Sequence, residues 1–343
     1  MIDVNKSEKF LSELTKLYAT SGDEKEVSLH LMSILSSFMP CKIDKLGSVV
    51  GTTGNGKHIL LDAHIDQIGL IVLGITDDGF VKVSKCGGAD PRVLTAASVT
   101  IHGKEKITGI VCSVPPHLKK DKSDNKVPDI DQIIIDTGYS KEKLDKIVSP
   151  GDRITFDGEY LRLLGDNVSS PCVDDRSGVV VILRTLEILQ NNKPDCKISV
   201  LFSSQEETGG SGAKAAAFNF DADEAICVDV SFAKQFDLTD DKYAETGKGP
   251  MIGFSPVLDR KMSLDFVSIA QTNGIPYQRE IMGSRTGTNA DDIQTAGNGT
   301  KCSVISIPIK NMHTCVEVVD LKDIELTAQL IANYIIEKGK END

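Results

Sequence analysis

Two adjacent carboxylates, Glu206 and Glu207, follow an apolar run at residues 198–202, which predicts a buried strand. Neighbouring acids at the end of such a strand repel each other and are costly to remove from water. A bound cation or a catalytic task would offset that cost. A solvated acidic turn would explain the pair equally well, so the other acids and histidines of the chain must decide between the two interpretations.

Four further segments place side chains that can bind a metal at or just beyond the end of a predicted strand. These segments contain His64 with Asp66, Asp174 with Asp175, Asp229, and His313. In open α/β sheets such strand ends meet at one crevice. Histidine and carboxylate ligands suit zinc, cobalt or manganese. This number of carboxylates suits a pair of divalent ions about 3.5–4 Å apart, with one acid bridging them.

The hydrophobic pattern predicts the elements that position these residues. Helical periodicity is found at 7–18, 27–38, 179–189, 262–272 and from 320 onward, and short apolar strands are predicted at 59–66, 198–202, 225–229 and 304–307.

Between about 70 and 162 the pattern changes to short β-like runs at 70–75, 80–84, 98–102, 107–114, 132–136 and 153–156. Glycine and proline turns separate these runs, and only a short helix at 141–147 interrupts them. This pattern of short strands and turns indicates a small all-β module inserted into an α/β domain. The polar run 119–126 is interpreted as a mobile loop.

Composition limits the environment and the partners of the protein. A chain of 343 residues can form one large domain or two moderate ones. The net charge of −12 argues against a nucleic-acid or anionic-membrane partner. The N-terminus lacks the apolar core of a signal peptide, and no apolar run reaches the length of a membrane span. The eight cysteines include no CxxC pair, which favours reduced thiols in a cytoplasmic protein over a disulfide framework.

Five motifs occur in a characteristic order along the chain. They are His64-Ile65-Asp66, Asp174-Asp175-Arg176-Ser177-Gly178, Gln205-Glu206-Glu207-Thr208-Gly209, Asp229-Val230, and the segment 307–320 around His313. This order resembles that of the tetrahedral di-metal aminopeptidases, a family that includes glutamyl and deblocking aminopeptidases and some members labelled endoglucanase. The inserted module is also similar, through residues 87–94 and 114–118. The resemblance runs from about Leu11 to the C-terminal helix, and five weak motifs in register make it specific.

The resemblance implies two divalent metal ions per subunit, zinc or cobalt, with manganese as the alternative. The ligands would be His64 and Asp229 on one ion, Glu207 and His313 on the other, and Asp174 bridging both. Glu206 would be the general base, and Asp66 would orient the imidazole of His64. In this chemistry the ions lower the pKa of a bridging water, Glu206 takes its proton, and the hydroxide attacks a peptide carbonyl. The resemblance also implies a cis peptide bond between Asp174 and Asp175.

Some positions differ from the family pattern, although none is a predicted ligand. Gln67 stands where glutamate is usual, which could loosen the metal site or alter a subsite for the substrate amine. Asn289 stands where aspartate is often found. Cys172 and Cys315 replace small or proline residues, and we interpret both as small buried side chains, with a redox or metal-trapping role as the alternative.

Other functions fit the sequence less well. A glycosidase would need two carboxyls about 5–9 Å apart across a sugar, and its groove would normally use aromatic platforms, whereas this chain has no tryptophan. A non-catalytic scaffold that self-assembles would not need the complete ligand set. A related di-zinc carboxypeptidase or deacylase is the nearest enzymatic alternative, but the all-β insert favours an aminopeptidase.

We therefore predict a metal-dependent aminopeptidase acting on short peptides, with an α/β fold. A mixed sheet sandwiched by helices would form from residues 1–68 and 163–343, with residues 69–162 as an inserted β-barrel. The resemblance implies assembly through the barrel into dimers and then a hollow dodecamer. The pocket for the N-terminal side chain is expected from loops near 229–250 and 283–292. Lys248 or Arg285 could favour acidic side chains there, although solvated surface positions are the simpler interpretation.

Overall fold

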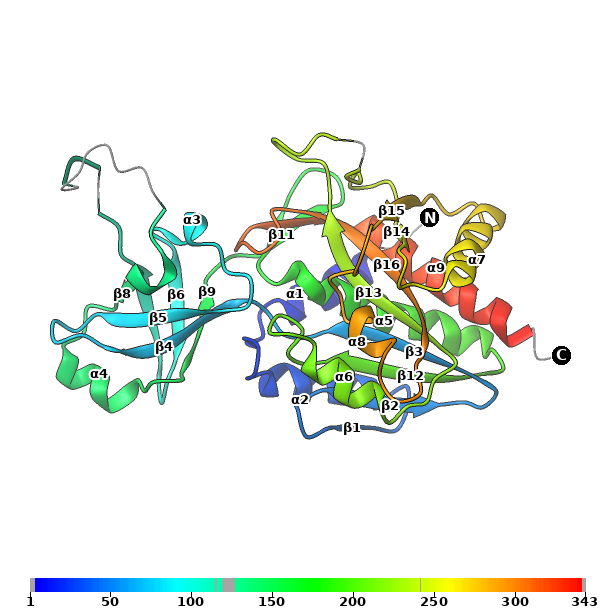
Figure 1. Ribbon diagram of the computed structural model, residues 1–343, viewed down its shortest axis with the longest axis horizontal. Coiled ribbons are helices and arrows are strands. Elements are labelled where there is room, and N and C mark those ends of the chain that lie inside the picture. Colours follow the sequence, from blue (N-terminus) through cyan, green and yellow to red (C-terminus); the bar gives the residue numbers. More distant parts are fainter. Residues whose placement is uncertain (1–3, 115, 119–126, 241, 341–343) are drawn as a thin grey trace.

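The protein consists of a large α/β body with a smaller barrel at its side (Figure 1). The computed structural model describes residues 4–114, 116–118, 127–240 and 242–340. The segment 119–126, predicted to be a mobile loop, lies outside the described residues, as does Pro115 of the motif at 114–118. The predicted fold class, a mixed sheet between helices with an inserted barrel, is confirmed.

The body is built on one mixed sheet. Its main strand order is β1 (Cys41–Ile43), β2 (Val49–Thr53), β12 (Cys196–Ser203), β3 (Lys57–His64), β13 (Glu224–Phe232), β16 (Lys301–Lys310), β17 (Glu317–Asp320), β11 (Asn167–Ser170) and β10 (Leu161–Arg162). β14 (Met251–Phe254) pairs with β16 and with β15 (Gln278–Ile281). The four central strands β12, β3, β13 and β16 run parallel, and the flanking strands pair antiparallel except for β14 and β15, which are parallel to each other. The carboxyl ends of the four central strands therefore lie at one edge of the sheet.

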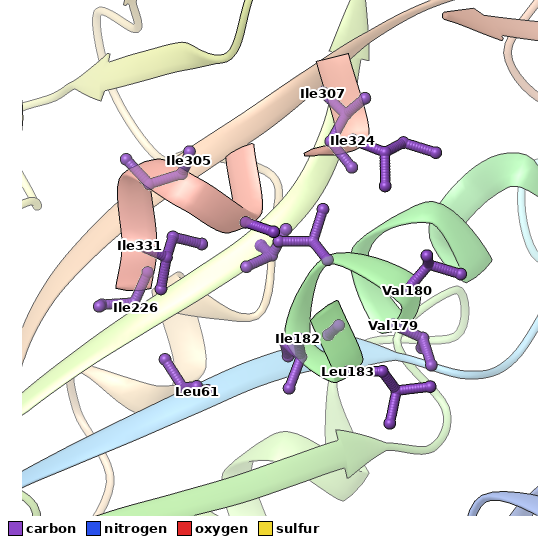
Figure 2. Close-up of a cluster of buried hydrophobic side chains, with 14 of the residues drawn as sticks. Leu61, Val179, Val180, Ile182, Leu183, Ile226, Ile305, Ile307, Ile324 and Ile331 are labelled. Atoms are coloured by element: carbon purple, nitrogen blue, oxygen red, sulfur yellow. The ribbon is translucent and has the colours of Figure 1, made fainter. Parts of the chain in front are cut away.

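The helices cover both faces of this sheet. One core contains residues of α1 (Asn5–Leu14), α2 (Lys25–Leu35), α5 (Val173–Asn192), α7 (Arg260–Thr272) and α9 (Leu321–Lys340). Figure 2 shows part of this core, where α5, α9 and the strands pack Leu61, Val179, Val180, Ile182, Leu183, Ile226, Ile305, Ile307, Ile324 and Ile331 together. All ten side chains are fully buried, so truncation of one to alanine would cost about 2–5 kcal/mol.

A second core lies on the opposite face, under α6 (Ser211–Ala217) and α8 (Ala290–Ile293). Leu60 and Leu201 belong to this core, whereas Leu61 and Phe202 belong to the first. Since side chains alternate along a strand, Asp62 and His64 share the face of Leu60, and Ser203 shares the face of Leu201. The functional side chains at these strand ends therefore lie on the side of α6 and α8.

The inserted module is a closed six-stranded barrel with its own core. Its strand order is β4 (Gly69–Ile75), β5 (Val81–Cys86), β8 (Ile134–Asp136), β7 (Lys106–Val111), β6 (Ser98–His102) and β9 (Arg153–Phe156). It also carries α3 (Pro91–Leu94), α4 (Lys141–Ile147) and the short 3-10 turns η1 (Pro116–Leu118) and η2 (Ile130–Gln132). All six predicted β runs are strands of this barrel. The domain limits at 68/69 and 162/163 remain a prediction, and β10 pairs with β11 of the large sheet.

Within the described residues, no helix is both long enough and apolar enough to cross a membrane.

Candidate metal centre

The five predicted metal ligands meet at the carboxyl edge of the central strands. His64 is the last residue of β3, and Asp229 lies in β13. Glu207 lies in the turn after β12, and His313 lies between β16 and β17. Asp174 comes from the first turn of α5 and reaches the same crevice. Parallel strands thus supply four of the residues, and a helix start supplies the fifth.

Asp174 occupies the middle of this cluster. One of its carboxylate oxygens lies 3.0 Å from Nε2 of His64, and the other lies 3.2 Å from Nε2 of His313. Each imidazole has a second carboxylate beside it, with Asp229 3.9 Å from His64 and Glu207 3.5 Å from His313. The cluster is therefore two half-sites that share one carboxylate. The peptide bond between Asp174 and Asp175 is cis, as the resemblance implied.

The donor atoms are close enough to bind common ions. Ligand atoms of His64, Asp174 and Glu207 lie within 4.8 Å of one another, and so do those of His64, Asp175 and Asp229. Nitrogen and oxygen donors of this kind fit zinc, cobalt or manganese. Asp175 is an additional acid in the second group, although its Oδ1 already accepts a hydrogen bond from the backbone N–H of Gly178 at 2.9 Å.

The electrostatics of the cluster also favour a cation. Burial, followed by the charge of Asp174, raises the pKa of Glu207 well above its ordinary value. Burial likewise raises the pKa values of Asp229 and Glu206. Burial opposes ionisation of Asp174 too, but hydrogen bonds from His313 and His64 outweigh it and lower the pKa of that carboxyl. A divalent cation would relieve the mutual repulsion of these acids.

Asp66 connects the two halves of the site. Its carboxylate oxygens accept hydrogen bonds from the backbone N–H groups of Glu206 and Glu207, both at 3.0 Å. Nδ1 of His64 lies 3.4 Å from the Asp66 carboxylate and 3.1 Å from the backbone oxygen of the same residue. Asp66 therefore fixes the turn of the two glutamates in addition to its predicted role of orienting His64.

The side chain of Glu206 lines a cavity of about 500 Å³. His64, Asp174, Asp229 and His313 line the same cavity. The glutamate is half-buried. A carboxylate in this position can reach a water or a substrate that enters the cavity.

The structure also reveals two acids that the sequence reasoning missed. Glu317 is 2% exposed, and it accepts hydrogen bonds from the backbone N–H groups of His313 at 2.7 Å and Asp174 at 3.1 Å. Glu24 is 4% exposed, and one of its oxygens accepts from the N–H groups of Gly22 at 2.7 Å and Gln205 at 3.1 Å. The only sequence signal for Glu317 was its place in the motif around His313. Both acids hold the backbone of segments that carry site residues.

These observations permit a comparison with known proteins. Residues 47–330 match the model of the M42 glutamyl aminopeptidase family. The chain belongs to this family. It is 34% identical over 311 residues to the lysyl aminopeptidase of Pyrococcus furiosus, with 88% of each chain covered.

Solved structures agree with the M42 assignment. The aminopeptidase APDkam598 from Desulfurococcus kamchatkensis superimposes with a TM-score of 0.90 at 32% identity, covering 97% of this chain and 95% of that one. The TET1 peptidase of Pyrococcus horikoshii, which can assemble into a tetrahedron or a large octahedral shell, superimposes with a TM-score of 0.86 at 32% identity. That match covers 96% of this chain and 99% of the other. The resemblance to tetrahedral aminopeptidases is thereby confirmed.

The barrel of this M42 chain contacts the metal centre through a glycine turn. A Cβ atom at Gly88 would lie 2.4 Å from Nδ1 of His313, which leaves no room for a side chain. Gly87 has a φ of 78°, and a Cβ atom there would lie 3.1 Å from Cβ of Glu207. The glycines of the motif at 87–94 are therefore required by close packing of the barrel against two candidate ligands.

Two of the unusual residues, Gln67 and Cys172, are buried close to the candidate ligands of this M42 chain. Gln67 is buried, and its backbone N–H donates to the carbonyl of Ala19 at 2.9 Å. Its side chain lines a narrow space shared with Asp174, Glu207 and His313. Burial raises the pKa of the Cys172 thiol to about 12, so the sulfur is protonated at neutral pH and packs as a small apolar group.

Neither candidate cation lines the described part of the cavity. Lys248 and Arg285 are absent from its described lining, and Nε of Arg285 lies 3.4 Å from a carboxylate oxygen of Asp291 instead. Glu280 does line the cavity, where it accepts hydrogen bonds from the hydroxyls of Ser231 and Ser306. A preference for acidic substrates based on Lys248 or Arg285 therefore receives no support from this geometry.

Replacement of Glu317 provides a first test of how the ligands are held. Glu317→Ala removes the acceptor shared by the backbone amides of Asp174 and His313. We expect metal affinity to fall by about 10–100-fold, because partners that orient metal ligands contribute on this scale. Titration with Co²⁺, followed by the absorption spectrum of the bound ion, would measure both affinity and coordination geometry.

A matched control is available in Glu325, another buried glutamate. Its carboxylate accepts hydrogen bonds from Ser7 of α1 and Arg184 of α5, and neither residue belongs to the candidate metal centre. Glu325→Ala should lower thermal stability and leave the Co²⁺ affinity unchanged. Equal metal affinities in the two variants would contradict the role assigned to Glu317.

Proposed function

We propose that this chain is a metal-dependent aminopeptidase that removes N-terminal residues from short peptides. The observation that supports this best is the position of Asp174, whose two carboxylate oxygens face His64 and His313 beside the Glu206-lined cavity. Membership of the M42 aminopeptidase family supports the same reaction.

The residues divide into two sets of ligands. His64 and Asp229 would hold one divalent ion, Glu207 and His313 would hold a second, and Asp174 would contact both. Zinc or cobalt is our first choice, with manganese as the alternative. When bound, such a pair lowers the pKa of a water and polarises a peptide carbonyl.

Glu206 would transfer the proton in this reaction. Its carboxylate can accept a proton from water and later deliver it to the leaving amine. Burial opposes ionisation of Glu206 and raises the pKa of its carboxyl. The hydrogen bond from its backbone N–H to Asp66 fixes the position from which it acts.

We further propose that the chain assembles into dimers through the barrel and then into a dodecamer. The TET1 peptidase of Pyrococcus horikoshii supports this, because it forms a tetrahedron or a larger shell. The barrel also exposes apolar side chains that a neighbouring copy could cover, including Leu73, Ile110 and Leu118. Light scattering should then give the mass of twelve copies of the 37.0 kDa chain.

Removal and return of metal would test the proposed activity. Protein stripped with a chelator should be inactive on aminoacyl-p-nitroanilides and short peptides, and zinc, cobalt or manganese should restore release of the N-terminal residue. Peptides with an acetylated N-terminus serve as the control and should remain intact. Metal should also stabilise the fold, by about 2.7 kcal/mol per site at a free concentration 100 times the Kd.

Two outcomes would overturn the proposal. Full metal occupancy without turnover of any peptide would indicate a non-catalytic homologue that self-assembles. Release of residues from the C-terminus, or removal of acyl groups, would indicate a related di-zinc carboxypeptidase or deacylase.

A further inference from the structure

Asn289, where the family often has aspartate, is buried in the body of the protein with an exposed fraction of 3%. Its side-chain nitrogen donates two hydrogen bonds, to a carboxylate oxygen of Asp62 at 3.0 Å and to the hydroxyl of Ser203 at 2.8 Å. Asp62 is also buried, at 1% exposure. The amide therefore supplies a hydrogen-bond donor to one oxygen of this buried acid.

The partners of Asn289 belong to the strands that carry the metal centre. Asp62 precedes His64 by two residues on β3, and Ser203 ends β12 just before the turn with Glu206. The amide oxygen of Asn289 lies 3.5 Å from the position a Cβ atom would have at Gly210, where that turn ends. One side chain thus bonds to both strands and lies beside the end of the turn that carries Glu206.

Asn289 itself belongs to a loop that forms part of the cavity wall. Thr286, Gly287 and Thr288 line the cavity beside the candidate ligands. Asp291 holds this loop internally, because its two oxygens accept from the N–H groups of Thr286 and Gly287, both at 3.0 Å. The side chain of Asn289 adds the connection between the loop and the sheet.

Which side chain is suitable at position 289 depends on the side chain at position 62. An aspartate at position 289 has no amide N–H groups, so it could not make the two donations that the Asn289 side chain makes to Asp62 and to Ser203. Asparagine at 289 is therefore the matched partner of an acid at 62.

We propose that Asp62 and Asn289 form a positioning pair that fixes the cavity loop 286–288 to the strands carrying His64 and Glu206. The difference from the family's usual aspartate at position 289 is then matched by the acid at position 62 and does not weaken the metal centre. Loop 286–288 then holds the N-terminal part of the substrate in a defined place. The inference rests on the proposed aminopeptidase activity for its kinetic readout.

Exchange of the two residues is the decisive experiment. We expect Asn289→Asp to raise the KM for aminoacyl-p-nitroanilides at least about 10-fold, with a smaller change in kcat, because the loop loses the two amide hydrogen bonds that join it to the strands. The double variant Asp62→Asn with Asn289→Asp restores one amide and one carboxylate and should bring KM back to within about 3-fold of the parent. The affinity for Co²⁺ should stay constant throughout, since the Asn289 side chain bonds to neither a candidate ligand nor the backbone amide of one, as Glu317 does.

Additional variants keep the test decisive. Should Asn289→Asp not fold, Asn289→Ala removes the two hydrogen bonds without adding a charge, and it should also raise KM. Glu325→Gln is the control for general loss of stability, and it should lower the melting temperature while KM stays at the parent value. A parent-like KM in Asn289→Asp or Asn289→Ala, or no recovery in the double variant, overturns the proposal.

Thermal melting separates this proposal from the proposed function. The melting temperatures of the parent, Asp62→Asn, Asn289→Asp and their double variant form a double-mutant cycle that needs no measurement of turnover. If the metal-loaded parent proves inactive, non-additive melting with recovery in the double variant still supports the pair, whereas additive losses refute it. An inactive parent by itself refutes only the aminopeptidase.

Discussion

Glu206→Gln is expected to lower the kcat of the metal-loaded enzyme by about 10²–10⁴-fold, the usual contribution of a general base. Glutamine has nearly the same shape but cannot accept the proton. The backbone N–H of residue 206 would still donate to Asp66, so the turn and the neighbouring Glu207 should keep their places. Steady-state kinetics on aminoacyl-p-nitroanilides, with metal content measured on the same samples, would provide the result.

The metal content decides what a loss of activity means. Parent-like occupancy with reduced kcat supports Glu206 as the base. A parallel loss of metal would instead make Glu206 a ligand, and an unchanged kcat would require the base to be a different residue.

Asp174→Asn should have an even broader effect, because Asp174 is the residue proposed to bind both ions. The asparagine side chain has one carbonyl oxygen, and its amide group would face the other imidazole, so it can serve at most one of the two half-sites. We expect bound metal to fall from two ions per chain to at most one, and peptide hydrolysis to disappear. Metal analysis after gel filtration would measure the stoichiometry directly.

Asp229→Asn is the matched control for this change. Asp229 lies beside His64 only, 3.9 Å from its Nε2, whereas Asp174 contacts both histidines. The control should therefore weaken one site and leave the other close to its original affinity. Retention of two ions by Asp174→Asn would contradict a bridging role.

Most of the fold could be predicted because its main elements carry strong local patterns. Barrel strands such as β6 and β7 alternate in polarity, glycine or proline turns separate the barrel strands, and the central strands contain short apolar runs. The outer strands could not be found in this way. β10 is two exposed residues, and β15 reads Gln-Arg-Glu-Ile with two exposed positions, so only their partners in the sheet define them.

The candidate metal ligands could be proposed from the sequence because of their own chemistry, whereas the residues that support them could not. His64, Asp174 and His313 carry their chemistry in their own side chains, within short motifs. Glu24 and Glu317 act on backbone amides that lie 181 and 143 residues away in the chain, and Asn289 finds Asp62 at a separation of 227 residues. No local pattern encodes such contacts, so the three-dimensional structure was needed to reveal them.

The glycine turn at Gly87 and Gly88 couples the position of the barrel to the binding of metal. Because it packs directly on His313 and Glu207, the seated orientation of the barrel and the metal-binding form of the two side chains favour each other. Such coupling is reciprocal. An assembly that fixed the barrels in this position would raise the affinity for metal, and bound metal would in turn stabilise the assembly. An isolated subunit would then bind its ions more weakly than an assembled one.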